Sequence, residues 1–205
     1  MIFDLDGCIA NTLPVWITAF IKTFKAFGKN MSEVELMRIG LNRIHETGYE
    51  GIDAEKFINK LYDVLKNGIA KAPLHEGMFE TISYLHNNGI KLAIVSSARR
   101  DQVKDYALSK GIIKYFDHIL GFEDTKNNKP HPEPILKAIE LLKVQPTDTI
   151  MIGDSDVDII AANQAGVTSV WFHPKINHLH YSPGQFAIHN PKYTISNIKE
   201  LINIL

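Results

Sequence analysis

The sequence predicts an α/β protein, in which a mainly parallel sheet is flanked by helices and an all-helical segment is inserted after the first strand. Two observations predict this class. From residue 78 onward, helical stretches alternate with short apolar runs, as expected for parallel strands that are buried on both faces. Between residues 14 and 74 the chain is instead helical in pattern, and this segment follows the first apolar run almost at once.

The first strand is the shortest of the expected elements. Met1-Ile2-Phe3 is apolar and Asp4-Leu5-Asp6-Gly7 follows directly, whereas a strand usually has about 5–6 residues. Either this strand is very short, or residues that precede Met1 in the natural protein are missing from this sequence.

The inserted segment carries recognisable helix signals. Pro14 suits a first helical turn, and an apolar stripe follows it as far as Gly28. Ser32-x-x-Glu35 is a capping-box pattern and predicts a second helix. Asp53 is the expected N-cap of a third helix, while the polar residues 42–51 predict a loop or a short helix.

After Pro73 the pattern changes to helices alternating with strands. Helices are expected at Met78–Asn87, Arg99–Lys110, Pro132–Lys143, Val157–Ala165 and Asn197–Leu205. Strands are expected at Lys91–Val95, His118–Leu120, Thr149–Ile152 and Ser169–Phe172. Trp171 and Phe172 are interpreted as buried strand residues.

Composition excludes several classes of protein. The 205 residues are 45% hydrophobic and 22% charged, close to a soluble globular average, which argues against disorder. The net charge of −1 argues against nucleic-acid binding, because such proteins usually carry a clear basic excess. The sequence contains neither an apolar run of membrane-spanning length nor a signal-peptide pattern, so we expect no membrane partner. The single Cys8 cannot form an intrachain disulfide, which fits a reducing cytoplasm.

Small polar or acidic residues follow three of the expected strands. Asp4, Ser96 and Asp154 each stand directly after an apolar run. In parallel α/β sheets the carboxyl ends of the strands form the ligand crevice, so these side chains should converge. Each acid alone could be a helix cap or a turn residue, but three such strand ends together favour a functional site.

The polar residues around these strand ends resemble the four motifs of the haloacid dehalogenase-like hydrolase superfamily, in that family's order: Asp4-Leu5-Asp6-Gly7, Ser96, Lys129-Pro130 and Gly153-Asp154-Ser155-x-x-Asp158. Residues 153–166 are similar to the phosphoglycolate phosphatase and β-phosphoglucomutase branch. The resemblance implies a Rossmann-like three-layer core of residues 1–12 and 75–205, with a small helical cap of residues 13–74. It also implies a cytoplasmic, Mg²⁺-dependent phosphatase that acts on a small phosphorylated metabolite.

The resemblance implies a role for each of four catalytic residues. Asp4 would attack phosphorus and form an aspartyl-phosphate, and Asp6 would act as general acid and base. Both acids can face one cleft, because the residue between them turns the opposite way in an extended segment. Ser96 would donate its hydroxyl to a phosphate oxygen, with Ser97 as a neighbouring substrate contact. Lys129 would supply positive charge, and Lys126 is the alternative for this role.

A hard cation is expected beside these acids, because two carboxylates near a phosphate dianion repel it. By resemblance, the Mg²⁺ ligands would be the Asp4 carboxylate, the Asp6 backbone carbonyl and the Asp154 carboxylate. Asp158 stands one helical turn after Asp154, so it is expected to be an auxiliary ligand or to support the ligands. Asp156 is interpreted as a helix-start acid.

Two positions depart from the pattern of the branch. Cys8 and Asn11 stand where the branch usually has Thr and an acid; Cys8 has no evident partner that would activate it as a nucleophile.

The cap supplies candidate substrate contacts. The polar loop of residues 40–46 resembles the substrate-facing loop of capped relatives. Arg43 is the first candidate there and His45 the second.

Several alternatives stay open at this point. A phosphosugar mutase of the same branch would keep the phosphoryl group instead of passing it to water. A phospho-accepting receiver domain also uses acids, a hydroxyl and a lysine, but the Asp4/Asp6 pair and the long insertion argue against it. The histidine-rich segment could hold a transition metal, although a merely polar loop is favoured; its histidines are His173, His178, His180 and His189. We expect a monomer or a weak dimer.

Overall fold

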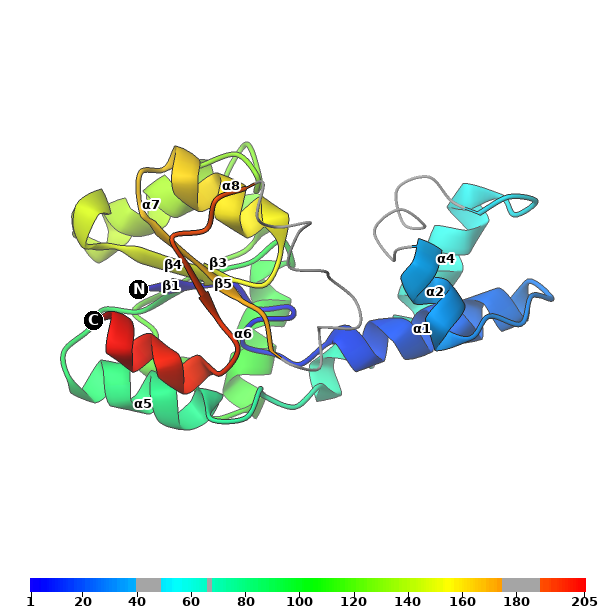
Figure 1. Cartoon of the computed structure of the whole chain (residues 1–205), viewed down its shortest axis with the longest axis horizontal. Helices are drawn as coiled ribbons and strands as arrows, with labels where there is room; N and C mark the ends of the chain where they lie inside the picture. Colours follow the sequence, from blue (N-terminus) through cyan, green and yellow to red (C-terminus); the bar gives the residue numbers. More distant parts are fainter. Residues whose placement is uncertain (40–48, 66–67, 175–188) are drawn as a thin grey trace. The chain divides into compact units, whose positions relative to one another are not determined.

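The computed structural model describes residues 1–39, 49–65, 68–174 and 189–205, which form two compact units. The larger unit contains Met1–Asn11 and Leu74–Leu205, and the smaller unit is the inserted segment Thr12–Pro73 (Figure 1). In the described part of the chain, we find no helix with the length and apolar character needed to cross a membrane.

The larger unit is built on a six-stranded sheet in the order β3-β2-β1-β4-β5-β6, in which every neighbouring pair is parallel. The strands are β1 (Ile2–Phe3), β2 (Ala93–Val95), β3 (His118–Leu120), β4 (Ile150–Gly153), β5 (Thr168–Phe172) and β6 (Tyr193–Ile195). The two-residue strand β1 lies between β2 and β4, and Ile2 is in register with Ala93 and Met151. The predicted α/β class with a parallel sheet is confirmed.

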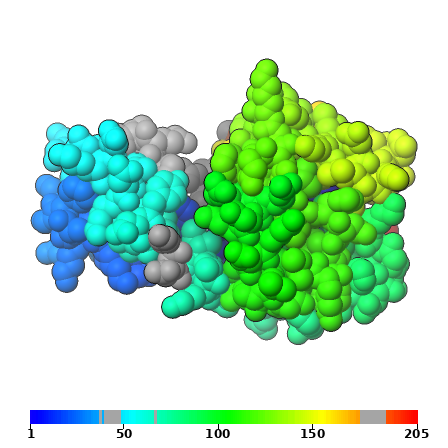
Figure 2. Space-filling model, turned by 180° about the vertical axis from the view of Figure 1, so that it is seen from behind, coloured from blue at the N-terminus to red at the C-terminus, as the bar shows by residue number. Residues whose placement is uncertain are grey.

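Helices cover both faces of this sheet and make a three-layer unit (Figure 1). They are α5 (Met78–Asn87), α6 (Arg100–Ser109), α7 (Glu133–Leu142) and α8 (Asp156–Gln164), with the 3₁₀ helix η6 (Ile198–Ile204) near the C-terminus. Figure 1 shows α7 and α8 on one face, and α5 with η6 on the other. Figure 2 shows this unit from behind, where the green surface is formed by residues from the middle of the chain.

The core between the sheet and the helices α7 and α8 is aliphatic. It contains Ile2, Ala93, Val95, Ile135, Ile139, Met151 and Ala161, all of them buried. Burial of one large aliphatic side chain contributes about 1.5–3 kcal/mol, so this cluster fixes the strands that carry the polar residues at their ends. Trp171 and Phe172 are buried in β5, as predicted.

The C-terminal segment differs from its prediction. The helix expected at 197–205 is a 3₁₀ helix, whose first turn is capped by the Asn197 side chain accepting from the Lys199 amide at 2.9 Å. Strand β6 was not predicted, because its three residues, of which Tyr193 and Thr194 are exposed, are too few to show a period.

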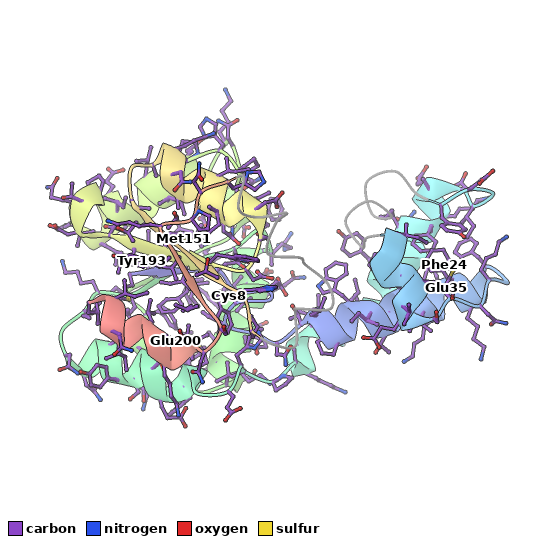
Figure 3. The ribbon with its side chains drawn as sticks, in the orientation of Figure 1. Cys8, Phe24, Glu35, Met151, Tyr193 and Glu200 are labelled. Carbon is purple, nitrogen blue, oxygen red and sulfur yellow. The ribbon has the colours of Figure 1, made fainter. Side chains whose placement is uncertain are left out.

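The described elements of the smaller unit are helical: α1 (Leu13–Ala26), α2 (Glu33–Ile39), α4 (Ala54–Leu65) and the 3₁₀ helix η1 (Ile69–Lys71). An aromatic cluster holds them together, in which the ring centroids of Phe24 and Phe57 are 4.8 Å apart. The expected capping box is present, since Ser32 N donates to Glu35 Oε2 and Glu35 N donates to Ser32 Oγ. Figure 3 labels Phe24 and Glu35 in this unit.

Candidate active site

Three neighbouring strands of the sheet end in the polar residues singled out by the sequence. Asp4 follows β1, Ser96 follows β2 and Asp154 follows β4, and these strands are adjacent in the order β2-β1-β4. Asp4 and Ser96 are buried, and Asp154 is half-buried. The carboxyl ends of three parallel strands therefore present two acids and a hydroxyl at one edge of the sheet.

A cluster of carboxylates lies at this edge. One oxygen each of Asp4, Asp154 and Asp158 lies within 4.8 Å of the others, which makes the cluster a candidate metal site. Asp158 comes from the first turn of α8. The structure thus brings these three acids together from two strand ends and one helix start.

Two glycines leave room for this close approach. A Cβ on Gly7 would lie 2.0 Å from Asp154 Oδ2, and a Cβ on Gly153 would lie 2.3 Å from Asp158 Cγ. Gly7 also has a φ of +82°, in the left-handed region that side-chain-bearing residues rarely adopt. Only glycine therefore fits at positions 7 and 153 without displacing a carboxylate of the cluster.

Lys129 is the cation of the cluster. Its Nζ donates to Asp4 Oδ1 and to Asp158 Oδ1, each at 2.6 Å, and to the backbone oxygen of Val95 at 3.1 Å. The side chain is only 3% exposed. Burial by itself would lower the pKa of Lys129, but the charges of Asp158 and Asp4 outweigh burial and raise the pKa above its ordinary value.

Lys126, the alternative to Lys129, is exposed and belongs to the loop that leads to α7. The Glu133 carboxylate accepts from the amides of Lys126 and Asn127, at 2.9 and 3.0 Å, and from the Asn127 side chain. These bonds hold the loop from which Lys129 extends into the cluster. Sequence reasoning missed Glu133, for which the only signal was an acid in the first turn of a predicted helix.

Both carboxylate oxygens of Asp158 are engaged. Oδ1 accepts from Lys129, and Oδ2 accepts from the Ser155 hydroxyl at 2.6 Å and the Ser155 amide at 3.2 Å. Asp158 is fully buried and forms the capping box of α8 with Ser155. This geometry suits a residue that holds Lys129 in place.

Burial and the charges of neighbouring carboxylates disfavour the ionised forms of Asp4 and Asp154. Burial, opposed by the charge of Lys129, raises the pKa of Asp4 to about 7. Burial and the charges of Asp4 and Asp158 raise the pKa of Asp154 well above its ordinary value. A divalent cation beside these carboxylates would relieve the desolvation and the repulsion together, so the donor set fits a hard cation with oxygen ligands.

Three further candidates stand shortly after β1 or β2 in the chain. Asp6 is half-buried and follows the buried Leu5. The Ser96 hydroxyl accepts from the Ala98 amide at 3.1 Å, and the hydroxyl hydrogen is left to donate elsewhere. Ser97 is exposed.

Cys8 lies buried beside the sheet (Figure 3). Its thiol donates to the Ile152 oxygen at 3.5 Å. Burial, with the charges of Asp4 and Asp154 adding to it, raises the pKa of the thiol well above its ordinary value. A reactive thiolate is therefore disfavoured at this position.

Other candidates fall outside the described residues or outside the cluster. Arg43 and His45 lie outside the described residues, as do His178 and His180 of the histidine-rich segment. His173 stacks on Trp171 with ring centroids 4.3 Å apart, and among the described residues it belongs to no metal-ligand group. His189 offers its backbone oxygen to Asn163.

Comparison with known proteins identifies the family of this chain. The model of a family described as haloacid dehalogenase-like hydrolase matches residues 1–172. Pyrophosphatase PpaX of Bacillus mycoides is 30% identical over 217 residues, covering 100% of this chain and 95% of that protein. Pyrophosphatase PpaX of Halalkalibacterium halodurans is 30% identical over 211 residues with the same coverage. A solved structure described as a predicted phosphoglycolate phosphatase from Haemophilus somnus has a TM-score of 0.79 at 24% identity, covering 99% of this chain and 96% of that chain.

Proposed function

The chain belongs to the haloacid dehalogenase-like hydrolase family, and on that premise we propose that it is a Mg²⁺-dependent phosphatase that hydrolyses a small phosphorylated metabolite through an aspartyl-phosphate intermediate. The observation that carries the proposal is the buried Asp4 carboxylate, which is bonded to Lys129 and lies within a cluster of acids at the carboxyl edge of the sheet. The relatives are named pyrophosphatases, so inorganic pyrophosphate is the first substrate to test.

Two displacements at phosphorus account for the reaction. In the first, an Asp4 oxygen forms a bond to phosphorus while the bond from phosphorus to the leaving oxygen breaks, and Asp6 donates a proton to that oxygen. In the second, Asp6 takes a proton from water, the water oxygen attacks phosphorus, and the Asp4–phosphorus bond breaks to release inorganic phosphate. Ser96 would donate its hydroxyl hydrogen to a phosphate oxygen, and Ser97 would contact the substrate beside it.

Charge balance explains the other polar residues. Lys129 neutralises Asp4 in the structure, which lowers the repulsion that an approaching phosphate dianion would meet. The carboxylates of Asp4 and Asp154, with the backbone carbonyl of Asp6, would hold Mg²⁺, which supplies positive charge to the transferring phosphoryl group. Asp158 is assigned to the support of this set, because its oxygens are bonded to Lys129 and Ser155.

We assign residues 1–12 and 75–205 to the catalytic core and residues 13–74 to a cap that selects the substrate. Arg43 is the first candidate for contact with the leaving group, and His45 the second. We propose that the protein is cytoplasmic and is a monomer or a weak dimer.

The proposal is tested by assaying phosphate release from pyrophosphate, p-nitrophenyl phosphate and a panel of phosphorylated metabolites. With Mg²⁺ present, the wild-type protein should turn over, and EDTA should suppress turnover until Mg²⁺ is restored. Asp4→Asn should abolish turnover, because an amide cannot form the acyl phosphate, while Asp105→Asn on the exposed side of α6 should leave it unchanged. Full activity in Asp4→Asn, or in EDTA, would refute the assignment.

The same assay separates the mutase alternative. A phosphosugar incubated with its bisphosphorylated form should give free phosphate if the protein is a phosphatase. An isomerised sugar phosphate, with no phosphate released, would favour the mutase instead.

A further inference from the structure

His75 is a buried histidine that the proposed chemistry does not use. It stands two residues after the inserted segment ends, and its Nε2 lies 3.0 Å from the backbone oxygen of Gly7. A carbonyl oxygen can only accept, so Nε2 carries the hydrogen and donates it. Burial lowers the pKa of His75 to about 4, so the ring is neutral at physiological pH. No pattern in the sequence indicates this contact, which spans 68 residues.

Gly7, the partner of His75, lies directly against the acid cluster. It follows Asp6, whose backbone carbonyl is a proposed metal ligand, and the position of its absent Cβ is 2.0 Å from Asp154 Oδ2. The Gly7 amide donates to the Ala10 oxygen at 2.9 Å. The peptide group before Gly7 is thus held by the bond to Ala10, and the peptide group after Gly7 by the bond to His75.

His75 is itself held on several sides. Its amide donates to the Ile9 oxygen at 3.1 Å, and its own oxygen accepts from the Met78 amide at 3.1 Å. The ring meets the Phe172 ring edge to face, with centroids 4.9 Å apart and an interplanar angle of 87°. The imidazole is consequently held in one orientation, packed against Phe172 of β5 and hydrogen-bonded to the Gly7 carbonyl.

We propose that His75 is a positioning residue for the metal site: by donating to the Gly7 carbonyl, it fixes the turn of Asp4–Gly7 and, through it, the spacing between the Asp6 carbonyl and the Asp154 carboxylate. This inference rests on the proposed function, because it takes the cation to be Mg²⁺ held by these ligands. Groups that hydrogen-bond directly to a metal ligand typically contribute about 10- to 100-fold to metal affinity. His75 acts one residue away from a ligand, so its contribution should lie at the lower end of that range.

Four variants separate the hydrogen bond from simple packing. His75→Phe keeps a ring against Phe172 and removes the donor. His75→Gln places an N–H donor the same number of bonds from the backbone as Nε2 of histidine, and His75→Met has the length of Gln without a donor. His86→Phe is the matched control, since the His86 ring also contacts a backbone oxygen, that of Tyr115 at 3.2 Å, on the surface of α5.

Mg²⁺ binding to each EDTA-treated, full-length protein is measured by titration calorimetry near pH 7.5, with the thermal midpoint recorded alongside. His75→Phe and His75→Met should bind Mg²⁺ about 10-fold more weakly than wild type, the lower end of the range for groups that orient metal ligands. His75→Gln and His86→Phe should bind with nearly wild-type affinity. If His75→Phe fails to fold, the Met and Gln pair carries the same comparison.

The outcomes distinguish failure of the positioning role of His75 from failure of the proposed function. Wild-type affinity in both His75→Phe and His75→Met would overturn the positioning role and leave the proposed function intact. An affinity of His75→Gln as weak as that of His75→Met would also overturn it, because restoring an N–H donor would then have restored none of the lost affinity. Failure of the wild-type protein to bind Mg²⁺ would overturn the proposed function, and this inference with it.

Discussion

Replacement of Gly7 by alanine should separate the cost of an unusual backbone angle from the cost of displacing a carboxylate. The new Cβ would lie 2.0 Å from Asp154 Oδ2 and 2.4 Å from its Cγ, whereas contacts under 3.0 Å essentially never occur. Asp154 therefore has to move by about 1 Å, and a displacement of that size in an active site can cost about 100-fold in rate.

The backbone angle carries its own cost, and Gly89 isolates it. Gly89 has a φ of +77°, close to the +82° of Gly7, but a Cβ there would meet no heavy atom within 4 Å. A side chain in the left-handed region costs about 1–2 kcal/mol. Gly89→Ala should lower the thermal midpoint by about 2–4 °C per kcal/mol in a chain of this size and leave turnover unchanged.

The assay combines thermal unfolding with Mg²⁺-dependent hydrolysis of p-nitrophenyl phosphate by both variants. Gly7→Ala should lose at least as much stability as Gly89→Ala and, in addition, about 100-fold of its turnover. Equal turnover in the two alanine variants would refute the reasoning, since the close approach of Gly7 to Asp154 would then have no bearing on the reaction.

Two further predictions concern the charges of the cluster. Because the pKa of Asp4 is raised to about 7, wild-type protein in EDTA should lose stability as the pH rises from about 4 to 7. Asp4→Asn should lack the part of this loss that Asp4 causes, so its thermal midpoint should exceed that of wild type above pH 7 and approach it near pH 4; a pH-independent difference would contradict this. Lys129→Met leaves Asp4 and Asp158 buried without their cation, so it should cost about 3–5 kcal/mol of stability in EDTA by thermal unfolding. A midpoint equal to that of wild type would show that the buried ion pairs contribute nothing.

The fold class could be predicted because it depends on long, repeated patterns. Short apolar runs that alternate with amphipathic stretches identify parallel strands and the helices that cover them, and the short runs predicted at Lys91–Val95 and His118–Leu120 gained support from their neighbours. Strand β6 has no such support, because the segment before it reads as a polar loop. The 3₁₀ character of η6 likewise has no signal in apolar spacing.

The candidate site was predictable to the extent that its residues follow strand ends. To predict that Asp4, Ser96 and Asp154 lie together, it was enough to predict the strands that precede them and the parallel direction of those strands. The contact between Asp158 and Lys129 did not follow from sequence spacing, because Lys129 lies 29 residues away and reaches Asp158 only through the fold. The contact between His75 and Gly7 is hidden for the same reason.

The isolated bridge between Ala10 and Leu74 bears on how such a protein can be rearranged. Antiparallel partners have Cα atoms about 4.5–5.5 Å apart, so the chain leaves the larger unit and re-enters it at nearly one point. A tight hairpin turn could join these two residues without disturbing the register of β1 against β2 and β4. The intervening 63 residues are therefore an exchangeable module, which recombination or a protein engineer could swap for another while the sheet and its acids stay in place.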